Sequence, residues 1–296
     1  MQILDGLAVR DSIAARLKQK IKKSGGVPAL AIIQVGKRED SNAYIARKKQ
    51  FAEEIGAKVF HLEFPDNVSE GELAQKIAEL NADKTIHGII LQMPLPKHLD
   101  ENKLIDLVSP QKDVDGLTST NMKLLLENKS GGFLAATAKG VLSLLDFYKI
   151  EIEGKRVVVV GRSATVGKPI ALSFLNRDAT VTVAHSRTPN LEAVTREADI
   201  LVSVVGKAKF IGAKYVQAGQ GVIDVGINPL SPEKNLAERK PEDEIPKRRI
   251  VGDVDFDSVK DIVSAITPVP GGVGPMTVAS LFENLVEAFE HQSKTS

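Results

Sequence analysis

Three side chains that could take part in catalysis recur at helical spacing near the start of the chain. Ser41, Tyr44 and Lys48 stand at i, i+3 and i+7, so on a helix a hydroxyl, a phenol and an ammonium share one face. The apolar run at 29–33 is typical of a buried parallel strand, which places this face at a strand's carboxyl end, where open α/β sheets bind ligands. A solvated helix face fits the same spacing, so the rest of the chain must decide between them.

Two more polar residues are expected at ligand-binding positions of the same α/β unit. Gln92 ends an apolar run, and the following Met93-Pro94-Leu95-Pro96 cannot continue a central strand, so Gln92 is predicted at a carboxyl end. Asp115 lies in the turn-rich KDVDG segment, which carries two carboxylates. Asp113 is interpreted as a solvated turn residue. Alternatively, Gln92 only closes its strand and Tyr44 is a half-buried core aromatic.

The second half of the chain contains a candidate nucleotide-binding turn. An apolar strand predicted at 155–161 runs into GRSATVGKP and then a helix, although Ser163 stands where a full G-x-G-x-x-G has its second glycine. This placement supports a phosphate at the helix N-terminus. At the end of the next strand, where an NAD enzyme usually presents a carboxylate, the chain has AHSRT instead. Arg162 and Ser186 offer positive charge and a hydroxyl there, which favours NADP over NAD.

Composition narrows the class of protein. A length of 296 residues with 43% hydrophobic content exceeds one compact core and predicts about two domains. The net charge of +1, without a long run of either sign, argues against a nucleic-acid or membrane-surface protein. No cysteine is present, so disulfides and thiolate chemistry are excluded, and the scattered histidines lack metal-ligand spacing, so no metal is expected. No signal peptide or long apolar stretch is found, which predicts a cytoplasmic protein.

Alternating helix and strand patterns predict an α/β fold. The elements expected up to residue 120 are helices at 11–23, 41–55, 69–80 and 101–107 and strands at 29–35, 58–64 and 86–92. Those expected later are a helix at 137–148, strands at 155–161, 180–184, 200–205, 221–225 and 250–254, and a helix at 276–289 that returns to the first domain. The charged segment 230–247 is interpreted as a mobile surface loop, and 121–136 as a connection between domains.

One obvious family is excluded by the order of the motifs. A Ser, Tyr and Lys set with a dinucleotide fold suggests a short-chain dehydrogenase, in which the glycine-rich loop opens the chain and Y-x-x-x-K follows. Here the order is reversed, since Tyr44 precedes Gly161 by more than a hundred residues.

Seven ordered motifs, spread over nearly the whole chain, resemble the bifunctional methylenetetrahydrofolate dehydrogenase/cyclohydrolase family, called FolD in bacteria. They are SNAYIARKK at 41–49, LQMPLP at 91–96, KDVDGL at 112–117, VVVVGRSATVGKP at 157–169, HSRT at 185–188, DVGIN at 224–228 and TPVPGGVGPMT at 267–277. The resemblance implies a folate-binding catalytic domain at 1–120 plus 276–296, a Rossmann-like NADP domain at 137–275, and an active site in the cleft. It also implies oxidation of 5,10-methylenetetrahydrofolate to the methenyl form, hydrolysis to 10-formyltetrahydrofolate, and a homodimer.

The resemblance further implies roles for single residues. Lys48 would be the central catalytic group, tuned by Gln92 and supported by Ser41, while Tyr44 stacks on the folate. Asp115 would hold the pterin's amino and ring N–H groups. The other implied contacts are Gly161, Arg162, Ser163, Ser186 and Ile227 to NADP, and Pro270, Gly271, Gly272, Val273 and Gly274 along the folate side of the cleft.

One segment departs from the family's pattern. Where the family usually has Pro-Cys-Thr-Pro, this chain has Ala135-Ala136-Thr137-Ala138, so both stiffening prolines are absent and Thr137 is left as a possible helix N-cap. The departure leaves three alternatives open: a dehydrogenase without the second activity, an enzyme that prefers NAD, and a catalytically silent binding protein.

Overall fold

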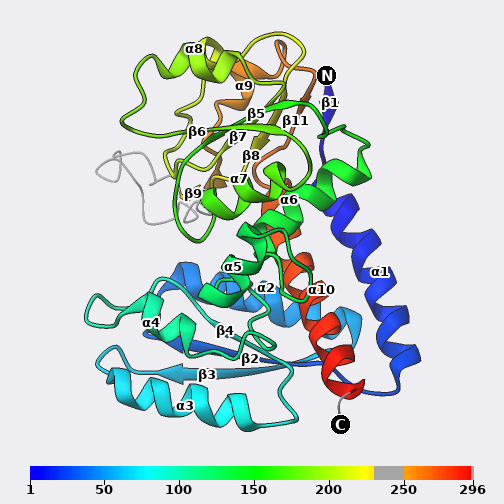
Figure 1. Ribbon diagram of the computed structural model, residues 1–296, viewed down its shortest axis with the longest axis vertical. Coiled ribbons are helices and arrows are strands. Elements are labelled where there is room, and N and C mark those ends of the chain that lie inside the picture. Colours follow the sequence, from blue (N-terminus) through cyan, green and yellow to red (C-terminus); the bar gives the residue numbers. More distant parts are fainter. Residues whose placement is uncertain (230–249, 295–296) are drawn as a thin grey trace, which may run out of the picture. The chain divides into compact units, whose positions relative to one another are not determined.

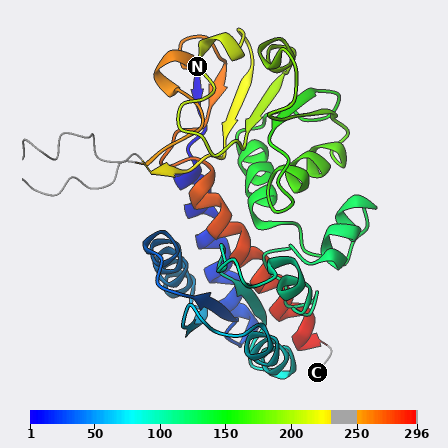
Figure 2. The ribbon, with the colours of Figure 1, turned by 90° about the vertical axis from the view of Figure 1, so that its left-hand side faces the viewer.

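The computed structural model describes residues 1–229 and 250–294, apart from the side chain of Asp40, and the surface loop expected at 230–247 lies outside them. The chain forms two compact units, each made of two separate stretches of sequence. The N-terminal unit comprises Ala8–Gly140 and Met276–Ser296, and the central unit comprises Met1–Leu7 and Val141–Pro275. The α/β class predicted from the sequence is confirmed in both (Figures 1 and 2).

A three-stranded parallel sheet forms the middle of the N-terminal unit, in the order β3-β2-β4. Its central strand β2 (Ala29–Val35) is buried along its whole length, as expected for an apolar run between two parallel neighbours, β3 (Lys58–Phe64) and β4 (Gly88–Leu91). Alternate side chains of β2, such as Ile33, pack against Leu73 and Ile77 of α3. The helices up to the domain connection are α2 (Glu39–Ile55), α3 (Glu70–Ala82), α4 (Glu101–Asp106) and α5 (Ser119–Leu126).

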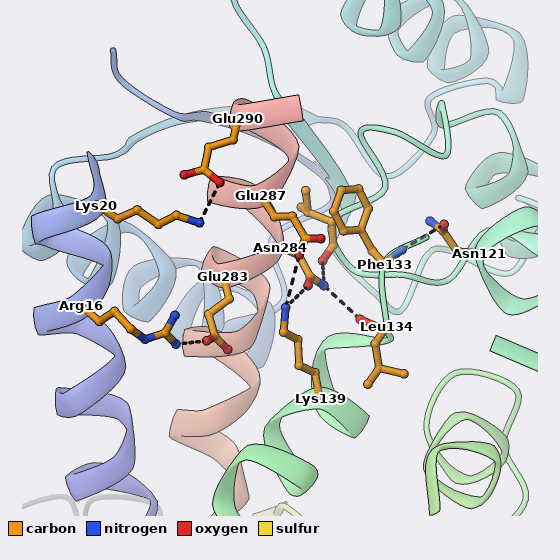
Figure 3. Close-up of polar contacts among 11 residues, drawn as sticks. Arg16, Lys20, Asn121, Phe133, Leu134, Lys139, Glu283, Asn284, Glu287 and Glu290 are labelled. Carbon is orange, nitrogen blue, oxygen red and sulfur yellow. Dashed lines mark hydrogen bonds and ion pairs between the residues drawn. The ribbon is translucent and has the colours of Figure 1, made fainter. Parts of the chain in front are cut away.

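The last helix, α10 (Val273–Lys294), returns to the N-terminal unit, which confirms the expectation from the sequence. It lies beside α1 (Gly6–Ser24), with ion pairs from Arg16 to Glu283 and from Lys20 to Glu290 (Figures 1 and 3). No helix in the described part of the chain combines the length and apolar character that a membrane crossing needs.

The central unit contains a six-stranded parallel sheet in the order β1-β11-β8-β7-β5-β6. The strand order reverses at β5 (Arg156–Val160), which lies between β6 (Thr180–Ala184) and β7 (Ile200–Ser203), and such reversal points are where doubly wound sheets bind ligands. The remaining strands of this sheet are β1 (Gln2–Ile3), β8 (Gly221–Asp224) and β11 (Ala265–Ile266). The helices are α7 (Gly167–Leu175), α8 (Leu191–Arg196) and α9 (Phe256–Val259), with a 3₁₀ turn at Ala213–Tyr215 and an antiparallel pair of β9 (Asn228–Pro229) and β10 (Ile250–Val251).

The compact units and the domains expected from the sequence divide the chain at different residues. Residues 1–7 were assigned to the first domain, whereas β1 joins the sheet of the central unit by pairing with β11. The segment 121–136 was expected to connect the domains, whereas α5 occupies much of it and belongs to the N-terminal unit. The interpretation of Thr137 as an N-cap is wrong, because α6 (Ala136–Phe147) begins one residue earlier and the Thr137 hydroxyl instead accepts a 3.4 Å hydrogen bond from Thr277.

Two buried carboxylates hold the loops of the central unit. The Asp253 carboxylate is fully buried and accepts hydrogen bonds from the backbone N–H groups of Val205 (2.5 Å) and Lys207 (2.9 Å) and from the Asn228 side chain (2.9 Å). Asp224 accepts three backbone N–H bonds, one of them from Asp253, and burial raises its pKa to about 6 despite these donors. These bonds fix the chain directly after β7 and β8.

We expect Asp253→Ala to lower the free energy of unfolding by about 3 kcal/mol or more, because it leaves several buried donors without an acceptor. Asp257→Ala is the matched control, since the side chain of that aspartate is 79% exposed and pairs with Lys260 at the surface. Urea unfolding followed by far-ultraviolet circular dichroism measures both variants. Equal stability of the two would contradict the structural role given to Asp253.

Candidate active site

Helix α2 places Ser41, Tyr44 and Lys48 on one face. Ser41 and Lys48 are buried and Tyr44 is half-buried, whereas the intervening Ala43 and Ala46 are exposed. The helix begins four residues after β2 and therefore starts at the carboxyl edge of the sheet. It ends at Gly56, whose positive φ of 85° allows its N–H to bond back to the last turn. The predicted face thus points inward rather than into solvent.

The Lys48 amine lies against Gln92. Lys48 Nζ donates a 2.9 Å hydrogen bond to Gln92 Oε1. The amide of Gln92 is oriented by its other contacts, since its Nε2 donates to the carbonyl oxygen of Met93 (3.1 Å) and its backbone N–H to that of Ile33 (2.8 Å). Because its nitrogen is committed elsewhere, Gln92 presents an acceptor to Lys48.

Asp115 lies in a loop whose neighbouring residues are all anchored. Lys112 is buried and its Nζ donates to the carbonyl oxygens of Leu80 (2.9 Å) and Asp83 (2.7 Å), at the end of α3. The carboxylate of Asp113 accepts hydrogen bonds from the backbone of Thr118 (2.8 Å) and Gly116 (3.0 Å) and from the Asn121 side chain (2.8 Å). The interpretation of Asp113 as a solvated turn residue is therefore wrong, because its carboxylate is buried inside the loop that it organises.

Lys48 and Asp115 influence each other electrostatically. Burial lowers the pKa of Lys48 below that of an ordinary lysine, and the Asp115 carboxylate opposes part of this effect. Burial raises the pKa of Asp115, Lys48 acts to lower it, and Asp113 adds a smaller rise. A lysine in this setting loses its proton more readily than a solvated one, and in its neutral form the amine can accept a proton from water.

The nucleotide turn of the central unit is built around close backbone contacts. Gly161 has a φ of 133°, and a Cβ added there would lie 2.3 Å from the carbonyl oxygen of Val204. Ser163 Oγ accepts a 3.1 Å hydrogen bond from the N–H of Gly167, which tightens the loop onto the start of α7. Arg162 and Ser186 are both exposed and follow β5 and β6, whose last residues are partners in the parallel pairing. Both loops therefore leave the same edge of the sheet.

The loop at 270–274 lies beside Ile227. The Ile227 side chain is 37% exposed, and a Cβ added to Gly274 would lie 3.5 Å from its Cδ1. Gly271 has a φ of 112° and its carbonyl oxygen accepts a 2.8 Å bond from Gly6, while the N–H of Gly272 donates to the carbonyl oxygen of Pro268. These bonds shape a tight loop, as the prolines and glycines predict. Val273 is buried at the start of α10, and the ligand contacts expected for Pro270 to Gly274 stay predictions.

The histidine side chains bond within the protein. His87 Nδ1 accepts the backbone N–H of Ala29 (3.1 Å), His98 Nε2 bonds the carbonyl oxygen of Val68 (3.0 Å), and His61 Nε2 bonds Gln34 Oε1 (2.7 Å). In the other unit, His185 Nδ1 accepts the N–H of Arg187 (3.1 Å). These contacts give the four rings structural roles within their units.

Comparison with known proteins decides the family. The family described as "Tetrahydrofolate dehydrogenase/cyclohydrolase, catalytic domain" matches residues 4–115, and its "NAD(P)-binding domain" matches residues 135–293. The chain belongs to this family. The bifunctional protein FolD of Geobacillus thermodenitrificans is 45% identical over 97% of this chain and 96% of the relative, and that of Methanoculleus marisnigri is 46% identical over 97% and 95%.

Solved structures of the family superpose on nearly the whole chain. The bifunctional enzyme FolD from Campylobacter jejuni has a TM-score of 0.91 at 39% identity and covers 98% of this chain and 99% of its own. FolD from Trypanosoma brucei, solved with NADP cofactor and an inhibitor, has a TM-score of 0.91 at 36% identity, with coverage of 99% and 98%. The two-domain fold, the family and the presence of a NAD(P)-binding domain inferred from the sequence are thereby confirmed.

We expect Lys48 to titrate below 10.5, because burial favours its neutral form. In Asp115→Asn the carboxylate that favours the ammonium is lost, so Lys48 should titrate at a still lower pH. Nuclear magnetic resonance of ¹³Cε-labelled lysine follows both titrations, with Lys48→Met assigning the resonance. A pKa at or above 10.5, or an upward shift in Asp115→Asn, would contradict the electrostatic description.

Proposed function

We propose that Lys48, Gln92 and Asp115 form the catalytic centre for two consecutive reactions on one bound folate. In the first, 5,10-methylenetetrahydrofolate gives a hydride to NADP⁺, and in the second, water converts the methenyl product to 10-formyltetrahydrofolate. The observation that carries the proposal is the buried Lys48 amine, 2.9 Å from Gln92 and influenced by Asp115, in a chain of the dehydrogenase/cyclohydrolase family.

In the hydride step the residues of this chain hold the folate. Asp115 accepts two N–H bonds from the aminopyrimidine edge of the pterin, and Tyr44 offers a half-buried aromatic face for stacking. Departure of the hydride is driven by the lone pair of the folate nitrogen, so geometry matters more than a base. The nicotinamide supplies the redox chemistry when bound.

The hydration step needs proton transfer. As the oxygen of water bonds to the methenyl carbon, the neutral amine of Lys48 takes a proton from that water. The Lys48 ammonium then returns this proton to N5 as the bond between the carbon and N5 breaks with its electron pair going to N5. Loss of the hydroxyl proton to solvent leaves the formyl group on N10. Gln92 Oε1 accepts a hydrogen bond from Lys48 Nζ and so aims the amine, while Ser41 supports this group from the same helix face.

NADP is the cofactor that the nucleotide loops favour. Arg162 and Ser186 leave the same sheet edge and are exposed, so both can reach a 2′-phosphate. The Trypanosoma brucei relative was solved with NADP. Gly161, Ser163 and Ile227 complete the proposed cofactor contacts.

The proposal includes a cytoplasmic homodimer, supported by the family resemblance of the sequence. Light scattering after size exclusion measures the mass in solution.

A spectrophotometric assay of the purified protein tests the proposed activities together. It follows NAD(P)H and the methenyl intermediate after addition of methylenetetrahydrofolate with each cofactor. Methenyl that forms and then decays shows both steps. Methenyl that accumulates without decay indicates a dehydrogenase alone, and no NAD(P)H indicates a silent binding protein.

We expect kcat/KM to be higher with NADP than with NAD, and Arg162→Ala to reduce NADP use selectively. Loss of one charge-assisted contact costs about 1.5 to 3 kcal/mol, which corresponds to roughly a tenfold to hundredfold rise in KM for NADP. Arg156→Ala is the control, because Arg156 lies at the opposite end of β5 and pairs with Asp199. Equal effects of Arg162→Ala on NAD and NADP would overturn the assignment.

We expect Lys48→Met to separate the two activities. Methionine keeps the apolar stem but cannot accept a proton, so the cyclohydrolase rate should fall by roughly 10²-fold or more, and the dehydrogenase rate by less. Lys49→Met is the control, since its Nζ contacts His61 Nδ1 at 3.0 Å. Both rates are measured on one preparation. Equal losses would make Lys48 a positioning residue, and an intact cyclohydrolase would remove it from the mechanism.

A further inference from the structure

The side chain of Asn284, in the middle of α10, is fully buried and makes three hydrogen bonds. Its Nδ2 donates to the carbonyl oxygens of Val114 and Leu134, both at 2.9 Å. Its Oδ1 accepts a 2.7 Å bond from Lys139 Nζ. Figure 3 shows the carboxamide between Lys139 and Leu134.

These two carbonyl groups belong to the segments that enclose Asp115. Val114 directly precedes Asp115, and the carbonyl oxygen of Asp115 itself accepts a 3.1 Å bond from the N–H of Ala136. The two segments are in backbone contact, because a Cβ on Gly116 would lie 2.7 Å from the backbone nitrogen of Ala135. Asn284 therefore ties together the two stretches of chain that fix the backbone of Asp115.

A second carboxamide makes a similar connection from the other side. Asn121 Oδ1 accepts a 3.2 Å bond from the N–H of Phe133, and its Nδ2 donates to Asp113. The Asp115 loop is thus joined to the 133–134 segment by Asn121 and by Asn284, but only Asn284 contacts the residue adjacent to Asp115.

Lys139 determines which way the Asn284 carboxamide faces. The Lys139 ammonium can only donate hydrogen bonds, so the oxygen of the Asn284 carboxamide must face it. The carboxamide nitrogen therefore faces the carbonyl groups of Val114 and Leu134. The Lys139 side chain lies mostly inside the unit, with Glu287 Oε2 3.8 Å away. An aspartate at position 284 would keep the size of the side chain and the contact with Lys139, but would turn an acceptor toward two other acceptors.

We propose that Asn284 is a positioning residue for folate, which holds the Asp115 carboxylate in place through the backbone of Val114 and Leu134. The proposal rests on the proposed role of Asp115 as the group that binds the pterin. Loss of Asn284 should therefore weaken folate binding in both reactions and leave the nucleotide loops of the central unit unchanged.

The test measures KM for folate, KM for NADP and kcat in Asn284→Asp and Asn284→Ala. Loss of the two hydrogen bonds from Asn284 Nδ2 predicts a rise in folate KM of roughly tenfold or more in both reactions, with KM for NADP unchanged. Gln292→Ala is the matched control, because Gln292 lies on the same helix and its Nε2 also donates to two carbonyl groups, those of His87 (2.9 Å) and Gln111 (3.3 Å). It should leave folate KM within about twofold of the parent.

Combination with Asp115→Ala separates positioning from a general structural role. If Asn284 acts through Asp115, Asn284→Asp adds little to the folate KM of the Asp115→Ala enzyme, whereas a general defect adds in full. Additive effects, or an equal rise in KM for NADP, would overturn the proposal. Should both Asn284 variants fail to fold, Lys139→Met provides the same measurement, since it releases the orientation of the amide and predicts the same selective rise.

The outcomes also distinguish this inference from the proposed function. If Asp115→Ala itself leaves folate KM unchanged, the proposed role of Asp115 fails. If Asp115→Ala raises folate KM but Asn284→Asp and Lys139→Met do not, only the role of Asn284 fails.

Discussion

The burial of the Lys48 amine and the Asp115 carboxylate is the constraint around which the N-terminal unit is built. Burial lowers the pKa of Lys48 and raises that of Asp115, and the electrostatic influence of each group on the other opposes these shifts. The surrounding polar side chains therefore bond mainly to backbone: Lys112 to the end of α3, Asp113 to the loop's own N–H groups. Because these partners are dipoles, they fix the loop without neutralising the site.

The central unit follows the same rule with different groups. Asp224 and Asp253 lie beneath the loops that follow β7 and β8 and bond chiefly to their backbone N–H groups. The side chains assigned to the cofactor phosphate, Arg162 and Ser186, are left exposed. In both units buried carboxylates thus hold loops, namely Asp113 in the N-terminal unit and Asp224 and Asp253 in the central unit.

Much of the fold was predictable because its signals are local. The apolar run of β2, the spacing on α2 and the breakers after Gln92 identify elements and ends directly from the sequence. The two-residue strand β1 carries no periodicity, and its partner β11 is more than two hundred residues away. Asp113 shows why the roles of site residues are harder to predict than helices and strands. The sequence KDVDG does not reveal whether solvent or backbone N–H groups bond to the Asp113 carboxylate. The role of Asn284 could not be predicted from local sequence, because the carbonyl groups that it contacts lie 150 and 170 residues earlier.

The pairing of β1 with β11 has a consequence for how the chain acquires its structure. β1 leaves the ribosome long before β11, so the sheet of the central unit cannot close until β11 has been made. The N-terminal unit waits equally long, since Leu285 of α10 packs where Gly88 leaves room for it. This chain therefore cannot complete the fold of one domain before the other has been synthesised. The central unit is completed only once β11 has been made, and the N-terminal unit only once α10 has been made.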